Sequence, residues 1–544
     1  MSTTSRILAR LSRLPSAQTY AVAVDRDLDV KMTDGTVLLA DRWHPGGQGG
    51  PPRAVVLLRS PYGRRQLGIV GRLFAERGYQ AVIQSCRGTF GSGGRWDPFH
   101  DEASDGRDTL SWIQQQPWCG PGIATFGPSY LGLTQWSLLD DPQPAPLAAI
   151  APSVTATAFR QAVIYPGGSF ALETALTWIN QVEHQELGAL RVLASMLTAR
   201  RAVRRGAAAA RLADADRLTV GRPVPYYQDW LTHDEKGDAW WDPLDFGRRL
   251  DNCPPASMTA GWYDIFLPAQ VADFEALQSR GVPARLTIGP WVHASPAGMA
   301  ASLRDALPWF DAHVGDGRPV PSGVRLFVMG DQRWVDLPAW PPPGTAQAWH
   351  LHPGGRLDPA SPPGGEPDRY RYDPADPTPS VGGPSLANSA GRKDQRARES
   401  RDDVLTYTSE VLAAPLTVAG PLTVRLHLRS SLEHTDVYVR LCDVTPRGRS
   451  ENLSDGILRV RPDTAQRAAD GTLQLTIAMW PTANTFRAGH RIRLQVSGGA
   501  HPLFARNTGT GEPLATARTM RAAEHQILHD PDHPSSVVLP VSTV

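Results

Sequence analysis

The sequence predicts an α/β domain followed by an all-β sandwich. Short apolar stretches typical of buried strands alternate with helical segments up to residue 150 and again from residue 256. This alternation favours a largely parallel sheet with right-handed crossovers. Beyond residue 320 the helical signal fades, and proline- and glycine-rich stretches separate short strands of alternating apolar and polar residues. Many short strands with frequent turns are typical of an antiparallel sandwich such as a jelly roll.

The expected elements follow one another closely along the chain. Residues 20–45 alternate around an Asp34-Gly35 turn, which predicts an opening antiparallel hairpin. In the rest of the α/β part we expect strands at 55–58, 79–84, 123–126, 147–150, 256–260 and 285–288, and helices at 68–77, 105–116, 130–139 and 268–279. Residues 155–245 are mostly helical in pattern. The C-terminal part includes expected strands at 422–428, 437–441, 473–478 and 492–496.

The length of 544 residues exceeds what one hydrophobic core holds, so we expect several domains. Residues 1–154 and 246–320 are predicted to form the two parts of the α/β domain. Residues 155–245 are predicted to form a helical insertion, and 321–544 the C-terminal jelly-roll sandwich. The aromatic residues of the insertion are expected mostly to fill its own core: Tyr226, Tyr227, Trp230, Trp240 and Trp241.

Composition excludes several classes of function. The 55 basic and 54 acidic residues nearly balance, which indicates neither a nucleic-acid partner nor an anionic membrane. The four cysteines are scattered without CxxC spacing, so we expect free thiols rather than disulfides or a zinc site. No stretch approaches the roughly 18 apolar residues of a membrane span, and the N-terminus lacks a signal-peptide core. These features predict a soluble, cytoplasmic protein.

A candidate nucleophile lies in the stretch from Gly120 to Leu139. Ser129 falls between a short buried strand and a helix, and a serine on such a sharp turn is the nucleophile elbow of α/β-hydrolases. The common G-x-S-x-G pattern is not met, because Leu131 holds the second glycine's place and Gly132 follows it. On this pattern alone, an ordinary turn is the alternative.

Two later residues complete a possible catalytic triad. A serine hydroxyl needs a histidine to take its proton and a carboxylate to orient that histidine. In α/β-hydrolases these partners follow later strands in the order Ser, Asp, His. Asp264 and His293 end two successive later strands, and His293 alone among fifteen histidines combines this order with this placement. His313 falls within an amphipathic helix, and His184 and His233 fall in the helical insertion. The three placements together favour catalysis.

The tetrahedral intermediate also needs hydrogen-bond donors for its oxyanion. The backbone N–H of Tyr130, directly after the nucleophile, is the first candidate. The second should come from the loop after an early strand, which here is Ser60 to Gly63 and has no HGGG-type run. The Tyr62 phenol is a possible donor, but a tyrosine at a strand end more often serves packing.

Three groups of motifs stand out along the chain. They are Gln116-Pro117-Trp118-Cys119 with Gly127 to Trp136; Gly261-Trp262-Tyr263-Asp264 with Gly289 to His293; and Asp394-Gln395-Arg396 with Glu399, Arg401, Asp403 to Leu405 and Tyr407 to Ser409. Together they resemble the cocaine esterase / X-Pro dipeptidyl-peptidase family. The resemblance implies an α/β-hydrolase domain with a helical cap and a C-terminal jelly roll, and a triad of Ser129, Asp264 and His293. It also implies that the Tyr62 hydroxyl and the Tyr130 amide form the oxyanion hole, and that the elbow has a G-x-S-Y-x-G form.

Two departures from the family pattern bear on specificity. The family often has an aspartate before the Arg-Gly of its glycine-rich loop, where this chain has Gln84-Ser85-Cys86-Arg87-Gly88. Relatives that hydrolyse α-amino acid esters carry acidic residues just after the triad aspartate, where this chain has Ile265, Phe266 and Leu267. A buried ammonium would go unpaired at a cost of several kcal/mol. A neutral, apolar or aromatic acyl group therefore fits better, unless the cap supplies a carboxylate.

We predict a serine hydrolase that cleaves carboxylic esters, with amides as a further option, through an acyl-enzyme. The partner is a small-molecule substrate, and no metal or organic cofactor is implied. The glycine-rich loop Cys86 to Gly94 does not predict a nucleotide site, because it lacks the Gly-Lys-Ser/Thr of a phosphate-binding loop. One alternative is an Xaa-Pro dipeptidyl-peptidase, and another is a non-catalytic scaffold or carbohydrate-binding protein. The acyl and leaving groups and the oligomeric state stay open, with a homodimer among the alternatives.

Overall fold

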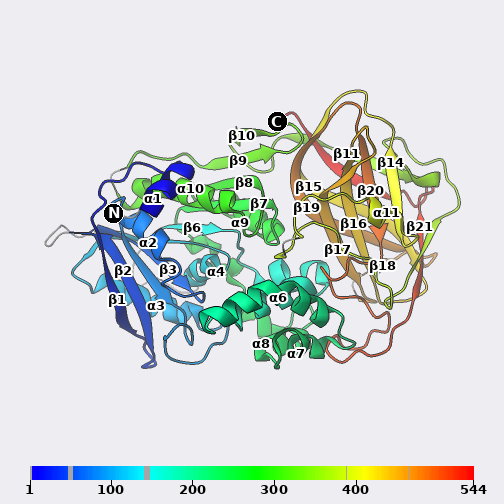
Figure 1. Ribbon diagram of the computed structural model, residues 1–544. Coiled ribbons are helices and arrows are strands. Elements are labelled where there is room, and N and C mark those ends of the chain that lie inside the picture. The colour runs from blue at the N-terminus through cyan, green and yellow to red at the C-terminus, as the bar shows by residue number, and fades with distance from the viewer. Residues whose placement is uncertain (1–2, 47–52, 140–146, 316, 388, 464) are drawn as a thin grey trace. The chain divides into compact units, whose positions relative to one another are not determined.

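The chain folds into two compact units (Figure 1). The computed structural model describes residues 3–46, 53–139, 147–315, 317–387, 389–463 and 465–544. The first unit comprises Met1–Phe159, Trp241–Gly261 and Ala269–Arg325. The second comprises Arg160–Trp240, Trp262–Pro268 and Leu326–Val544. Most of the helical segment predicted at 155–245 thus belongs to the same unit as the C-terminal β-strands, and so does the short segment Trp262–Pro268.

A twisted sheet forms the centre of the first unit. Its strands lie in the order β1-β2-β4-β3-β5-β6-β7-β8. The first two form the expected antiparallel hairpin, and β3 pairs in parallel with both β4 and β5. The order therefore reverses between β3 and β5, and ligands of open α/β sheets bind beyond the carboxyl ends of strands at such a switch point. The strands are β1 (Val22–Lys31), β2 (Val37–Pro45), β3 (Arg53–Ser60), β4 (Gln80–Ser85), β5 (Cys119–Pro128), β6 (Leu147–Ser153), β7 (Ala256–Tyr263) and β8 (Ala284–Val292).

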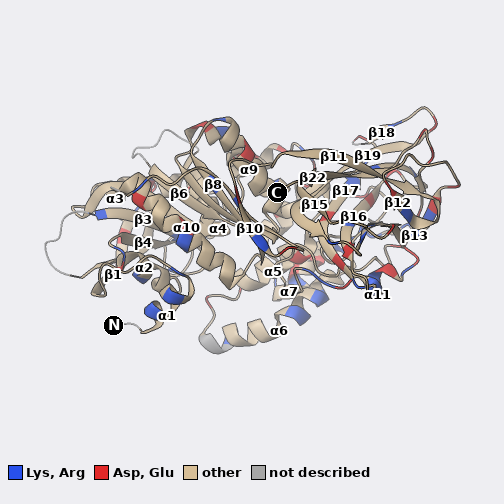
Figure 2. Ribbon diagram, turned by 90° about the horizontal axis from the view of Figure 1, so that it is seen from above, with Lys and Arg blue, Asp and Glu red and all other residues tan. Residues whose placement is uncertain are grey.

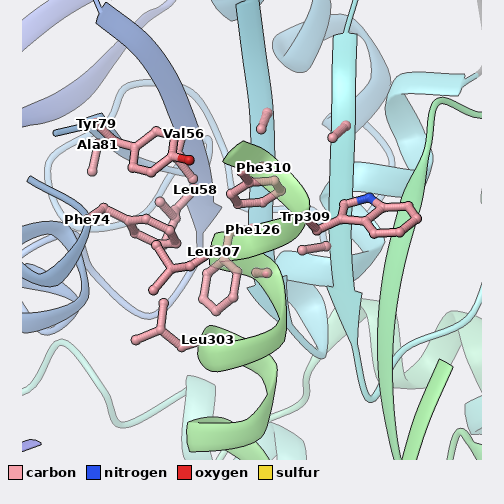
Figure 3. Packing of buried hydrophobic residues seen from close by; sticks show 14 of the residues in the cluster. Val56, Leu58, Phe74, Tyr79, Ala81, Phe126, Leu303, Leu307, Trp309 and Phe310 are labelled. Atoms are coloured by element: carbon pink, nitrogen blue, oxygen red, sulfur yellow. The ribbon is translucent and has the colours of Figure 1, made fainter. Parts of the chain in front are cut away.

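Helices cover this sheet and bury its apolar residues. Alternate side chains of β3 to β6 pack against α2 and α10, where Phe74, Leu307, Trp309 and Phe310 are buried (Figure 3). Thr125 lies between two residues of this cluster on β5, so its side chain points to the other face and hydrogen-bonds Gln135 of α4 at 3.0 Å. The helices are α1 (Thr3–Leu11), α2 (Gly68–Ala75), α3 (Glu102–Gln114), α4 (Tyr130–Trp136), α9 (Leu267–Ser279) and α10 (Pro296–Val314).

The helical segment of the second unit has an aromatic core, as predicted. Tyr226, Tyr227 and Trp230 are at most 5% exposed, and the rings of Tyr226 and Trp230 lie 5.4 Å apart between centroids. Trp241 differs, since it belongs to the first unit and packs near Phe159 there. The main helices of the segment are α5 (Leu172–Val182), α6 (Ala189–Ala207), α7 (Ala215–Val220) and α8 (Pro225–Thr232).

The rest of the second unit is the expected all-β domain. Its twelve-stranded sheet has the order β13-β21-β15-β22-β11-β12-β14-β20-β16-β17-β19-β18, and an additional β15–β19 pairing closes most of it on itself. Before it, β9 (Gly323–Val328) begins in the first unit, and β10 (Arg333–Leu337) follows. The elements of the domain are β11 (Gly344–His352), β12 (Arg356–Asp358), β13 (Asp368–Tyr372), α11 (Arg396–Glu399), β14 (Val404–Ser409), β15 (Leu416–Ser430), β16 (Thr435–Val444), β17 (Ser450–Val460), β18 (Gln466–Arg467), β19 (Leu473–Phe486), β20 (Arg491–Ser497), β21 (Ala523–Leu528) and β22 (Ser536–Ser542).

The structure thus confirms the predicted fold class, an α/β domain with an inserted helical segment and a C-terminal all-β domain. The N-terminal helix α1 was not foreseen. Basic and acidic residues are interspersed along the ribbon of both units (Figure 2), which agrees with the balanced composition. In the described part of the chain, every helix is too short or too polar to cross a membrane.

Candidate active site

Ser129 stands on a strained turn between β5 and α4. Its φ of 57° and ψ of −121° lie in a region that L-residues rarely adopt, at a cost of about 1–3 kcal/mol. Neighbouring glycines allow the turn: a Cβ added at Gly127 would lie 2.4 Å from Leu131 Cβ, and one at Gly132 would lie 2.3 Å from Thr155 Cγ2. The position where a side chain would clash with Thr155 is therefore Gly132. Leu131 can thus occupy the position that is the second glycine in the common G-x-S-x-G motif. The predicted elbow is present.

His293 lies within hydrogen-bonding distance of the serine. It follows β8 directly, and its Nε2 is 3.0 Å from Ser129 Oγ. Both side chains are half-buried. In the tautomer with its proton on Nδ1, the imidazole accepts the Ser129 hydroxyl proton through Nε2. Two of the three residues predicted for the triad are therefore brought together.

The other histidines considered in the sequence have local partners instead. His313 Nδ1 of α10 lies 2.8 Å from the Trp309 carbonyl, and His184 Nδ1 lies 2.7 Å from that of Asn180. His233 Nδ1 is 2.7 Å from Asp238 Oδ2.

Asp264 follows β7, the neighbour of β8 in the sheet, and its side chain is fully buried. Its Oδ1 accepts a hydrogen bond from the Phe266 N–H at 2.8 Å. Its carbonyl accepts one from the Trp480 indole N–H at 3.2 Å. Asp264 belongs to the second unit, as does Trp480. Trp480 lies 216 residues further along the chain, and no sequence pattern connects the two.

Tyr62 and Tyr130 flank the switch point of the sheet. Tyr62 follows β3, and its N–H donates to Ser60 Oγ at 3.1 Å. Tyr130 is the first residue of α4, where backbone N–H groups have no partner within the helix and point along its axis. The two rings meet edge to face, with centroids 6.4 Å apart. The structure thus brings the two predicted oxyanion-hole residues together.

The Tyr130 hydroxyl binds two residues that no sequence motif identified, Glu102 and Phe99. The hydroxyl donates to Glu102 Oε1 at 2.8 Å and accepts from the Phe99 N–H at 2.9 Å. Glu102 in turn pairs with Arg59, with Nη2 2.6 Å from Oε2. Burial and the Glu102 carboxylate raise the pKa of the Tyr130 phenol well above its usual value, so the phenol remains a donor.

Cys86 lies in the same buried cluster. Burial, the Glu102 charge and a hydrogen bond to Glu102 raise the pKa of its thiol well above the usual value. A neutral thiol cannot replace the charge of the aspartate that the family often carries near this position. The adjoining Ser85 accepts instead from the Arg64 Nη1–H at 3.2 Å, while Arg64 Nε binds Asp41 at 3.1 Å.

An aromatic row continues from Tyr130 within the first unit. The Phe99 ring stacks on Tyr130 at 4.5 Å between centroids, Phe159 lies 4.1 Å from Phe99, and Trp241 lies 6.3 Å from Phe159. The rings of Phe99, Phe159 and Trp241 are each at most 5% exposed, and they add no charge to this part of the first unit.

A histidine beside a serine at a strand-to-helix elbow, on a mixed α/β sheet and ahead of an all-β domain, defines a serine hydrolase of the α/β-hydrolase class. Residues 34–295 match the family model of the X-Pro dipeptidyl-peptidase (S15 family). Residues 320–538 match that of the X-Pro dipeptidyl-peptidase C-terminal non-catalytic domain.

Known relatives agree with this class. The chain is 34% identical to the cocaine esterase of Rhodococcus sp. (strain MB1 Bresler), over 96% of this chain and 99% of that protein. The chain therefore belongs to the cocaine esterase / X-Pro dipeptidyl-peptidase family and is a serine hydrolase. The non-catalytic alternative loses its support.

Solved structures share the fold over nearly the whole chain. An aminopeptidase from a marine sediment archaeon (Thaumarchaeota) superimposes with a TM-score of 0.81 at 22% identity, covering 97% of this chain and 98% of that one. An α-amino acid ester hydrolase superimposes with a TM-score of 0.79 at 23% identity and the same coverage. At these identities the likeness establishes the fold.

Proposed function

We propose that this protein hydrolyses carboxylic esters of small, neutral acyl groups through an acyl-enzyme on Ser129. The observation that carries the proposal is the 3.0 Å separation of Ser129 Oγ and His293 Nε2 at a strained elbow. His293 takes the proton as Ser129 attacks, and gives it to the leaving alcohol. It then takes a proton from the water that attacks the acyl-enzyme, and gives that proton to Ser129 Oγ as the carboxylic acid leaves. Asp264 orients the imidazole through Nδ1, a role that its burial and its place after the strand next to β8 support.

The Tyr62 hydroxyl and the Tyr130 N–H donate to the oxyanion of the tetrahedral intermediate. Their places beyond β3 and β5 support this role, because Tyr130 directly follows Ser129 and the Tyr62 ring packs against the Tyr130 ring at the switch point. No metal or organic cofactor takes part in this mechanism.

A neutral acyl group is favoured by the residues after Asp264. Ile265, Phe266 and Leu267 are each at most 6% exposed, so this segment offers no carboxylate to an ammonium group. The aromatic row at Phe99 and Phe159 is equally apolar. The named activity of the Rhodococcus relative, an esterase, supports esters as the substrate class.

A serine variant tests the proposal directly. Ser129→Ala should lower kcat/KM for p-nitrophenyl esters by about 10⁴-fold or more, since triad members act as a unit. It should also abolish labelling by a fluorophosphonate probe. Ser137→Ala is the matched control, because Ser137 is a buried serine just after the elbow helix that bonds the Thr134 carbonyl. Full turnover by Ser129→Ala would overturn the proposal.

The second candidate function is release of Xaa-Pro dipeptides, which the matching family description favours. Such a substrate brings a free ammonium that needs a carboxylate partner. We expect kcat/KM for an aryl ester to exceed that for an Xaa-Pro anilide on the same preparation. A preference for the anilide would reverse the assignment.

We further propose a cytoplasmic protein whose partner is the small-molecule substrate, with neither nucleic acid nor membrane bound. The near-balance of charge supports this. Recovery in the membrane fraction after lysis would contradict it, and sedimentation would settle whether the chain is a homodimer. For the domain plan we propose 1–154 and 246–320 as the hydrolase domain, 155–245 as the cap and 321–544 as the jelly roll.

A further inference from the structure

One buried carboxylate, that of Glu102, binds Tyr130, which carries one proposed oxyanion donor, and Arg59, which lies three residues before the other, Tyr62. Glu102 is the first residue of α3 and is 4% exposed. Oε2 pairs with Arg59 of β3 at 2.6 Å, and Oε1 accepts from the Tyr130 hydroxyl of α4 at 2.8 Å. The two oxygens of one side chain therefore connect β3 to α4.

On the β3 side, Arg59 fixes the end of the strand that leads to Tyr62. Arg59 is 2% exposed, and Nη1 donates to the Glu102 carbonyl at 2.7 Å while Nε donates to Gln84 Oε1 at 3.1 Å. Two further residues, Ser60 and Pro61, separate Arg59 from Tyr62. With its guanidinium bound on three sides, this strand end has little freedom to move.

On the α4 side, Tyr130 is bound through both ends of the residue. Its hydroxyl donates to Glu102 and accepts from Phe99, and its ring packs against those of Phe99 and Tyr62. Its backbone N–H, the other proposed donor, directly follows the strained Ser129. A shift of the Tyr130 ring would therefore move the amide and the nucleophile together.

We propose that Glu102 is a positioning residue for the oxyanion hole, holding the Tyr130 amide and the Tyr62 hydroxyl at one fixed spacing. The proposal rests on the proposed function of Ser129. Glu102 does not touch the substrate; it acts through Arg59 and Tyr130. Oxyanion donors work only within a narrow range of distances, and a displacement of about 1 Å costs on the order of 10²-fold in rate.

The most conservative test removes one hydroxyl. Tyr130→Phe deletes the bond to Glu102 together with the bond that the Phe99 N–H donates, and keeps the ring, the backbone and the Arg59–Glu102 pair. We expect kcat for an aryl ester to fall about ten-fold with little change in KM, because the interaction matters only in the transition state. The inhibition constant of an aryl boronic acid, which forms a tetrahedral adduct, should rise by the same factor.

Tyr79→Phe is the matched control. Tyr79 is also a buried tyrosine of the first unit whose hydroxyl donates to a carboxylate, that of Asp311, and it lies in the hydrophobic core. The two variants should lose similar thermal stability, but Tyr79→Phe should keep the wild-type kcat and boronate affinity.

Glu102→Gln, combined with Tyr62→Phe in a double-mutant cycle, separates positioning from general support. If Glu102 acts through the oxyanion hole, its substitution should lower kcat far less in the Tyr62→Phe background than in the wild type. Additive effects, or a Tyr130→Phe enzyme with wild-type kcat and boronate affinity, would overturn the inference. Full activity of Ser129→Ala in the same assay would instead overturn the proposed function.

Discussion

Each unit of the molecule buries an arginine–carboxylate centre, and the two centres serve different ends. In the first unit Arg59 pairs with Glu102, and in the second Arg440 pairs with Asp455 at 2.6 and 2.9 Å. The two arginines are 2% and 0% exposed. The local chemistry is thus nearly the same, and only what each centre connects to differs.

The Arg440–Asp455 centre joins the segment from Asp394 to Ser409 to the sheet of the all-β domain. Arg440 Nη1 donates to Gln395 Oε1 at 2.7 Å, and Arg398 Nη2 donates to Ser497 Oγ at 2.7 Å. Burial and the nearby Arg440 charge lower the pKa of Arg398 to about 10. The third group of family motifs, from Asp394 to Ser409, therefore binds the sheet of the all-β domain.

The Arg59–Glu102 centre is instead connected to the candidate active site. Glu102 accepts from the Tyr130 hydroxyl, and Tyr130 directly follows the half-buried Ser129, which lies beside His293. A buried ion pair is therefore no evidence of an active site by itself, because structural networks perturb charged groups equally. The Arg59–Glu102 centre differs because Tyr130 connects it to Ser129, the candidate nucleophile, whose backbone is strained.

The largest expected effect is on stability, and it comes from removing the Asp455 carboxylate from the Arg440–Asp455 pair. Asp455→Ala leaves Arg440 buried without its carboxylate, which should lower the free energy of unfolding by about 3–5 kcal/mol. We expect kcat per folded molecule to stay unchanged, in contrast to Tyr130→Phe. Urea unfolding with active-site titration measures both, and Glu524→Ala, which breaks the exposed pair with Arg371, is the control. If Asp455→Ala lowered kcat without lowering the free energy of unfolding, the Arg440–Asp455 pair would serve catalysis, and the two centres would no longer differ in function.

A smaller effect concerns a buried carboxylate bound by hydroxyl and amide donors rather than by a guanidinium. Asp273 of α9 accepts from the Thr157 N–H at 2.9 Å and from its hydroxyl at 2.6 Å. Burial raises the pKa of Asp273 from 3.8 to about 7. The folded protein therefore holds a proton that the unfolded chain releases, so stability should fall as pH rises from about 4 to 7.

Asp273→Asn removes this titration. The variant should match the wild type in Tm at about pH 4 and exceed it increasingly from there up to about pH 8, in a series of thermal unfolding curves. Asp245, which adds to the rise in the Asp273 pKa, is kept in both proteins. Parallel Tm profiles for the two proteins would show that Asp273 is ionised in the native state.

The smallest effect distinguishes the cysteines of the two centres, Cys86 and Cys442, from the more exposed Cys119. Cys86 lies beside Glu102, and Cys442 accepts from Gln495 Nε2 at 3.4 Å. Burial raises the pKa of Cys442 to about 12, and Cys86 is fully buried. Neither should react with Ellman's reagent in the native protein, whereas the half-buried Cys119 should react first. A Cys119→Ser variant that still releases one thiol equivalent at the same rate would contradict this.

Much of the site could be predicted because its signals are local. Ser129 follows a short apolar strand and precedes a helix, and Asp264 and His293 end later strands, so chain order and strand position carried the prediction. The motif around Leu131 and Gly132 looked irregular, and the structure explains it by the contact of Gly132 with Thr155. The oxyanion role proposed for Tyr62 rests on the family resemblance, since no local pattern separates a donor from a packed tyrosine.

The sequence by itself determined the order of strands and helices, the elbow and the apolar character of the segment after Asp264, since each depends on residues close together in the chain. Only the tertiary structure decided that Glu102 joins Arg59 to Tyr130, and that Trp480 binds the Asp264 carbonyl. Glu102 lies 43 and 28 residues from its two partners, and contacts at such separations leave no periodicity in a single sequence. Packing of strands and helices alone brings these side chains together.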